Sequence, residues 1–125
     1  MNNISDALER ARGDGQALHK RIAKLTDKNR ANVQAESVIL SGQAHELARY
    51  VKILMNGQQA DVAQHLKEAA STLEGLANDT RRLAVTHESD LEGKNREALQ
   101  RAWRAVEKLT QAVAANRSAA DIARS

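Results

Sequence analysis

The chain has 125 residues, a net charge of +3 and no proline, cysteine or phenylalanine, and its aromatic residues are Tyr50 and Trp103. The absence of cysteine excludes disulfides and a zinc site held by thiolates. A β-sandwich or barrel of this size would need more aromatic and β-branched residues. Alanine and leucine dominate, and with no proline to break them they favour helices.

Apolar residues recur every three to four positions over residues 4–25, which predicts a first amphipathic helix. Gly13 and Gly15 interrupt this helix, and each costs it roughly 1 kcal/mol relative to alanine. Because the apolar spacing stays in phase across both glycines, we favour one continuous helix with another backbone packed close at Gly15. The alternative is that residues 1–12 form a separate arm.

A second apolar run over residues 33–54 is one residue out of phase with the first. The segment between the two runs is polar, so the phase slip and the composition together predict a turn within residues 27–32. The alternative is one long helix with a local stutter in its heptad pattern.

A third run covers residues 62–83 and follows a glycine-containing boundary at residues 56–58, where glycine relieves the left-handed backbone that ends a helix. A fourth run covers residues 91–120 after the polar stretch 86–90, and residues 117–125 are expected to fray. The fourth run has the clearest heptad pattern, in Leu99, Ala102, Val106, Leu109 and Val113.

Short polar side chains mark candidate helix starts: Asn3 or Ser5 for the first helix and Asp61 for the third. Short connections between four helices of similar length force antiparallel neighbours. The sequence therefore predicts an all-α, up-down-up-down four-helix bundle with coiled-coil-like packing and an extended first helix, in one domain over residues 1–125. Its alanine-rich core is thin, and thin cores often gain stability by oligomerising.

Charge is unevenly spread, because residues 10–30 carry seven basic and two acidic side chains while residues 31–80 carry three and six. Three lysines at four-residue spacing, with one arginine beside them, form a basic stripe: Lys20, Lys24, Lys28 and Arg21. Such a stripe can follow nucleic-acid phosphates, although this region has no aromatic residues to stack on bases. A solubilising face, an acidic protein partner and the acidic middle of the chain are the alternatives.

The two aromatic residues are candidate interface residues, because Tyr50 and Trp103 each lie one position from a core-facing residue. Aromatic side chains at such positions often only close the edge of a bundle, but they also supply large contact areas at interfaces. We therefore interpret Trp103, together with Arg104 and Tyr50, as a contact with another chain.

Catalytic and metal-binding patterns are missing from the sequence. No two of the four histidines have the i, i+4 spacing of a helical metal site, no Gly-x-Ser-x-Gly turn is present, and no glycine-rich loop follows a strand. The six-residue segment His65-Leu66-Lys67-Glu68-Ala69-Ala70 faintly resembles the motif of histidine phosphotransfer domains. However, leucine follows the histidine directly, and Glu68 replaces a small residue of that motif.

These observations predict a non-enzymatic interaction protein that self-associates or docks partner helices through its outer faces, with no cofactor, metal or small-molecule substrate. A small basic protein that binds DNA or RNA through the basic stripe is the second hypothesis, and a histidine-based phosphocarrier is the weakest. The longest apolar run has four residues, so membrane insertion is not expected. With no signal-peptide pattern at the start, we expect a cytoplasmic protein, or one exported without a cleavable signal.

Overall fold

The computed structural model describes residues 3–124 of the chain, and the side chains of residues 4–119. The described chain contains four α-helices and one short 3₁₀ turn, with these bounds: α1 Asn3–Ala23, η1 Leu25–Asp27, α2 Arg30–Leu54, α3 Ala60–Leu83 and α4 Glu88–Arg124. The all-α prediction is therefore confirmed.

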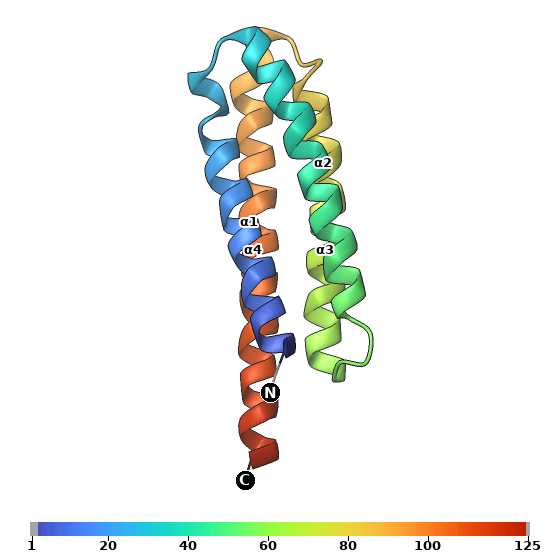
Figure 1. The fold of residues 1–125 in the computed structure, drawn as a ribbon. Coiled ribbons are helices and arrows are strands. Elements are labelled where there is room, and N and C mark those ends of the chain that lie inside the picture. Colours follow the sequence, from blue (N-terminus) through green and yellow to red (C-terminus); the bar gives the residue numbers. More distant parts are fainter. Residues whose placement is uncertain (1–2, 125) are drawn as a thin grey trace.

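The four helices form an up-down-up-down bundle in which α1 packs on α2 and α4, and α3 packs on α2 and α4 (Figure 1). Contacts between distant residues establish the antiparallel order. Near one end of the bundle, Asn95 of α4 contacts the backbone of Ile22 in α1. Toward the other end, Arg117 of α4 pairs with Glu9 of α1 at 2.7 Å.

One continuous core joins all four helices, and the predicted helical faces supply it. Nearly every position of the 4-3-4 patterns is buried, including Gly15 and the polar residues Ser37, Thr80, Asn95 and Asn116. Additional alanines widen the core-facing stripes: Ala48, Ala70, Ala77, Ala105 and Ala112. Small side chains allow the helices to approach closely, which explains how so few large residues fill the core.

The first helix is continuous across both glycines, as the favoured interpretation held, so residues 3–12 belong to α1 and form no separate arm. A side chain at Gly15 would place its Cβ 3.3 Å from Leu109 Cδ1 and 3.4 Å from Val106 Cγ2 of α4. Gly15 therefore does lie in close packing with α4, but the expectation that another backbone approaches it is wrong, because side chains fill this space. Ser5 lies inside α1 and is not its N-cap.

The first turn lies earlier than the sequence predicts, because α1 ends at Ala23 and α2 already begins at Arg30. Leu25, in η1, continues the apolar pattern of α1 into the core although it lies beyond the helix end. Asn29 is the N-cap of α2, and its side-chain oxygen accepts a hydrogen bond from the Asn32 N–H at 3.0 Å. One long helix with a stutter is therefore wrong.

The second turn contains Gly57, which has a left-handed φ of +78°. This agrees with the predicted boundary at residues 56–58. The N-cap of α3 is Gln59 rather than Asp61, since Asp61 lies in the first turn of the helix. The Asp61 carboxylate accepts a hydrogen bond from the Val62 N–H at 3.0 Å instead.

The fourth helix is 37 residues long and extends past the ends of its neighbours (Figure 1). Before its start, the His87 ring nitrogen Nδ1 accepts from the Ser89 N–H at 3.2 Å. The helix continues to Arg124, and Ser125 lies outside the described residues. Fraying of residues 117–125 concerns motion and stays a prediction. No helix in the described chain has the length and apolar character needed to cross a membrane.

Candidate functional site

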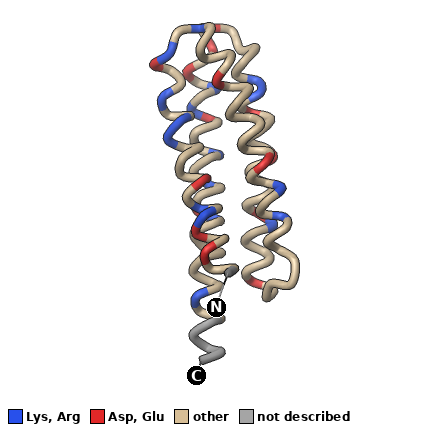
Figure 2. The backbone as a smooth tube through the Cα atoms, viewed as in Figure 1, with Lys and Arg blue, Asp and Glu red and all other residues tan. Residues whose placement is uncertain are grey.

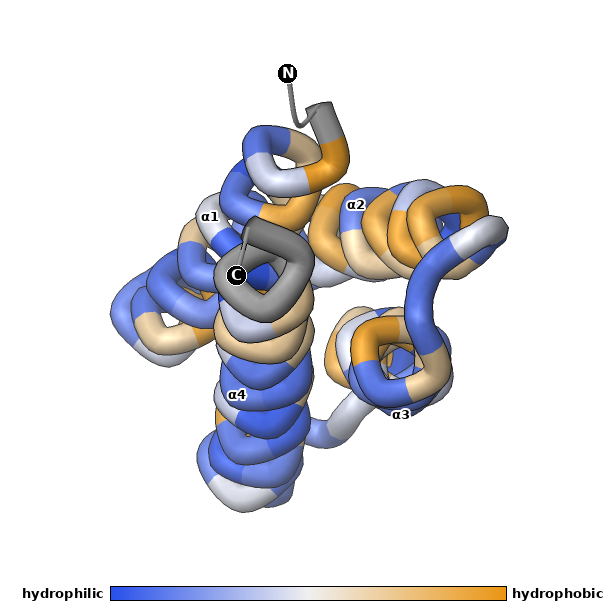
Figure 3. The backbone as a smooth tube through the Cα atoms, turned by 90° about the horizontal axis from the view of Figure 1, so that it is seen from below, coloured by the Kyte–Doolittle hydropathy of each residue, from blue (hydrophilic) through white to orange (hydrophobic). Residues whose placement is uncertain are grey.

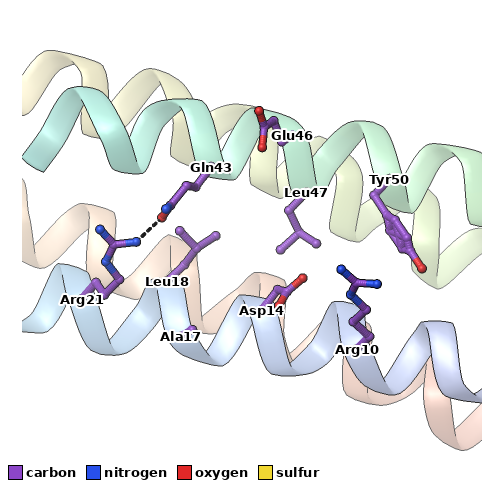
Figure 4. Close-up of a pocket in the computed structure, with 9 residues that line it drawn as sticks. All are labelled: Arg10, Asp14, Ala17, Leu18, Arg21, Gln43, Glu46, Leu47 and Tyr50. Carbon is purple, nitrogen blue, oxygen red and sulfur yellow. Dashed lines mark hydrogen bonds between the residues drawn. The ribbon is translucent and has the colours of Figure 1, made fainter.

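A groove of about 450 Å³ lies between α1 and α2 (Figure 4). Its floor contains the buried side chains of Leu18 and Leu47. The remaining lining residues are polar, aromatic or small, and come from both helices: Arg10, Asp14, Ala17, Arg21, Gln43, Glu46 and Tyr50.

The groove exists because α1 presents a polar face to α2. Arg10, Asp14, Ala17 and Arg21 follow one another at four-three-four spacing, which places them on one side of a helix. These residues do not close the space to α2 with apolar packing. Figure 4 shows Arg10 and Asp14 reaching toward α2, with the Tyr50 ring extending from α2 beside Arg10.

Arg21 closes one end of the groove. Its guanidinium donates hydrogen bonds to the Gln43 side chain and to the Glu36 carboxylate, both on α2. Arg21 thus uses its charge inside the molecule, against the acidic middle of the chain, which is one of the alternatives given for the basic segment.

The open part of the groove carries free charges of both signs. Arg10, Asp14 and Glu46 form no ion pair with any other described residue. Unpaired charged groups around a small apolar floor can form charge-assisted hydrogen bonds with a molecule that covers the floor. The groove thus offers groups that can recognise such a molecule.

The basic stripe does not form along one helix as predicted. Because α1 ends at Ala23, only Lys20 and Arg21 lie on the helix, while Lys24 and Lys28 flank the 3₁₀ turn η1. Figure 2 shows segments of Lys or Arg, in blue, along the end of α1 and the connection to α2. The three lysines are exposed, and none forms an ion pair within the described part of the chain.

The three predicted interface residues do not form one surface. Tyr50 lines the groove between α1 and α2, whereas Trp103 and Arg104 line a shallow pocket between α1 and α4 together with His19. Tyr50 therefore lies on the other side of α1 from Trp103 and Arg104, and a contact of these three residues with another chain stays a prediction. Trp103 is nevertheless 51% exposed, which agrees with a position at the edge of the bundle.

The histidines lie apart from one another. His45 contacts Glu74 at 3.1 Å across α2 and α3, and His19 packs against Trp103. His65 is half-buried, with its Nδ1 atom enclosed and lacking a hydrogen-bond partner. Among the described side chains of residues 4–119, no three of histidine, aspartate or glutamate gather in a way that suits a metal ion.

Several large apolar residues remain exposed on the outer side of the bundle. Val38, Ile39 and Ile53 of α2 are 60%, 49% and 68% exposed. Figure 3 shows hydrophobic positions along most of α2, in contrast to the hydrophilic outer side of α4. These exposed apolar residues therefore lie on α2, which also forms one wall of the groove.

Sequence reasoning identified Tyr50 and Arg21 but missed Arg10, Asp14 and Glu46 as groove residues. For Arg10 and Asp14 the signal was their four-residue spacing beside the core-facing stripe of α1, which gains meaning only once α2 is placed opposite, and Glu46 of α2 had no such signal. Comparisons with protein-family models, curated proteins and solved structures give no match for this chain. A functional assignment therefore depends on the geometry of the surfaces described above.

Proposed function

We propose that this protein is a non-enzymatic interaction protein that docks an amphipathic helix of a protein partner in the groove between α1 and α2. The observation that carries the proposal is the groove itself, with two buried leucines at its floor and unpaired charges along its walls. Helix-in-groove binding uses this combination, in which apolar anchors fill the floor and polar groups form the rim.

The dimensions of the groove suit a helix. On α1 it extends from Arg10 to Arg21, which is roughly 16 Å at the rise of an α-helix. Three turns of a partner helix cover that length and present apolar anchors at positions i, i+3 or i+4, and i+7. The volume of about 450 Å³ then holds side chains of the partner and not its backbone.

A small-molecule ligand fits the groove less well. Ligand pockets enclose most of the ligand and are lined mainly by apolar and aromatic side chains. Here the apolar lining consists of Ala17, Leu18 and Leu47 beside Tyr50, and the other lining residues are charged or carry an amide. Exposed walls of mixed charge resemble the polar rim of a protein interface.

Two exposed positions provide a direct test by photo-crosslinking. A photo-reactive phenylalanine derivative replaces Ala17 in the groove or, as the matched control, Ala35 on the outer side of α2; both alanines are exposed and helical. We expect the Ala17 position, and not Ala35, to crosslink to one protein species. Mass spectrometry should place the crosslink in an amphipathic helix.

Charge reversal at the groove provides a second test of the proposal. Arg10→Glu should weaken the complex, whereas Arg49→Glu, at an exposed position outside the groove, should leave it unchanged. Sedimentation distinguishes a foreign partner from a second copy of the chain, because self-association gives a mass that rises with concentration. The same crosslinked product from both positions would contradict the proposal. The absence of any crosslink, together with a monomer mass that does not change with concentration, would also contradict it. A cytoplasmic location is part of the same proposal.

A further inference from the structure

The edge between α1 and α4 holds the only tryptophan of the chain in an exposed position. The Trp103 side chain is 51% exposed, and its ring centre lies 5.4 Å from that of His19, with the ring planes tilted by 55°. Half of a large apolar surface is thus open, while His19 packs against the indole from α1.

Cationic side chains flank the exposed indole on both helices. Lys20 of α1 and Arg104 of α4 line the shallow pockets beside Trp103, and both are exposed. Neither forms an ion pair within the described residues, so both charges are available. Glu107 is the one carboxylate among the residues lining these pockets.

This arrangement corrects an inference drawn from the sequence. The basic segment around Lys20 has no aromatic residue of its own, which argued against base stacking. The fold brings Trp103 beside Lys20 from a position far along the chain. An aromatic platform and a basic helix end therefore lie side by side.

The surroundings of Trp103 favour nucleic acid over a protein partner. Protein hot spots place a tryptophan within well-packed pockets that exclude water. Here the neighbours that share its pockets include the amides of Gln16 and Gln100 and the charges of Lys20 and Arg104. An aromatic surface with cations around it is the combination that binds single strands, whose bases stack while phosphates meet basic groups.

We propose that His19, Lys20, Trp103 and Arg104, named here the Trp103 surface, bind single-stranded nucleic acid. One base stacks on the indole, and Lys20 and Arg104 contact the neighbouring phosphates. Because stacking and phosphate contacts are common to DNA and RNA, both bind. Paired bases in a duplex do not reach the indole. The surface is separate from the groove between α1 and α2, so this proposal does not depend on the partner helix.

Trp103 is its own reporter, since no other tryptophan contributes to the fluorescence. Titration with a 12-nucleotide oligo(dT), or with the matching oligo(U), should quench the fluorescence at low salt and lose its effect at high salt. A 12-base-pair duplex and inorganic polyphosphate should leave the fluorescence unchanged, because neither offers an unpaired base.

Variants separate stacking from charge in an anisotropy assay with a labelled oligo(dT). Trp103→Leu should weaken binding about five- to 150-fold, the range that corresponds to one base–aromatic stack, while Trp103→Tyr retains most of it. The double variant Lys20→Gln, Arg104→Gln should reduce the slope of log affinity against log salt by about 1.4, at roughly 0.7 per phosphate for single strands.

The matched control removes two exposed positive charges from α3, with Lys67→Gln and Arg82→Gln. We expect this control to bind like the wild type, and circular dichroism checks that every variant is folded. Equal binding by Trp103→Leu and wild type, or equal losses in the α3 control, would overturn the proposal. A change in fluorescence with protein concentration in the absence of oligonucleotide would also overturn it. Trp103 would then lie in an interface with a second copy of the chain.

Discussion

Asn95 of α4 donates a hydrogen bond from its side-chain amide to the backbone carbonyl of Ile22, at 3.3 Å, across the bundle. The last carbonyls of a helix have no partner within that helix, and Ile22 lies in the last turn of α1. A buried polar residue of α4 therefore completes the hydrogen bonding of α1. This contact also fixes the level at which α1 ends against α4.

Replacing Asn95 should destabilise the bundle. Asn95→Ala removes the donor and leaves the buried Ile22 carbonyl without a partner, which costs about 1–3 kcal/mol. We expect that decrease in the free energy of unfolding in urea, followed by circular dichroism. Gln100→Ala, at an exposed position of the same helix, should change it by less than about 0.5 kcal/mol. Equal effects of the two substitutions would show that the Asn95 contact contributes nothing.

The sequence was sufficient to predict the helices and the residues that face the core. Leu40, Ala44 and Leu73, for example, are fully buried at the positions that the apolar spacing assigns to the core. The core positions could be predicted because the spacing of apolar residues along a helix determines which of its faces is buried. Leu25 shows the limit, since its spacing continues the first helix although it lies in a 3₁₀ turn.

The candidate surfaces were less predictable, because they depend on residues from two helices. Trp103 and His19 come together only when α4 returns along α1. Likewise, Arg10 was one basic residue among several until its helix placed it opposite Tyr50. Spacing defines the face of one helix, but the rotation of its neighbour determines which faces meet.

The three helical glycines of α1 and α2 should respond differently to alanine. Nothing lies within 4 Å of a Cβ built at Gly13 or Gly42. Each Gly→Ala substitution there should stabilise the protein by about 0.5–1 kcal/mol, because alanine loses less backbone freedom in a helix. Thermal and urea unfolding measure this gain.

Gly15→Ala is the matched comparison. Its Cβ would meet Leu109 and Val106 of α4 at 3.3 and 3.4 Å, so those side chains must move. Crowding of a packed core typically costs 1–3 kcal/mol, and we expect Gly15→Ala to be at least about 1 kcal/mol less stable than Gly13→Ala. Equal gains at both positions would contradict the close packing of α1 on α4.

Acid should weaken the contact between α2 and α3. Burial raises the pKa of the Glu74 carboxyl, but hydrogen bonds from His45 and Lys52 outweigh it and hold the pKa below the usual 4.5. A carboxyl with a lowered pKa stabilises the fold above its unfolded-state value, and this contribution is lost as the pH falls through the folded-state value. The loss therefore lies below about pH 4.5.

Glu74→Gln isolates this effect. The variant should be less stable than the wild type at pH 7, and the difference should shrink as the pH falls below about 4.5, because the wild-type carboxylate becomes protonated. Urea unfolding at several pH values measures the difference, and NMR titration of the Glu74 carboxyl measures its pKa. A difference that stays constant with pH would rule out this linkage.

Gly57 should be the glycine whose replacement by alanine costs stability through the backbone alone. Its φ of +78° is left-handed, and nothing lies within 4 Å of an added Cβ. Gly57→Ala should therefore lower the free energy of unfolding by about 1 kcal/mol, the cost of a left-handed backbone for an ordinary residue. Gly57→Asn should cost less, since asparagine tolerates this conformation. Because added side chains meet only solvent at Gly57 and at Gly42, the opposite signs expected for alanine at these positions depend on φ alone. Stabilisation by Gly57→Ala would mean that the turn between α2 and α3 does not adopt this backbone in solution.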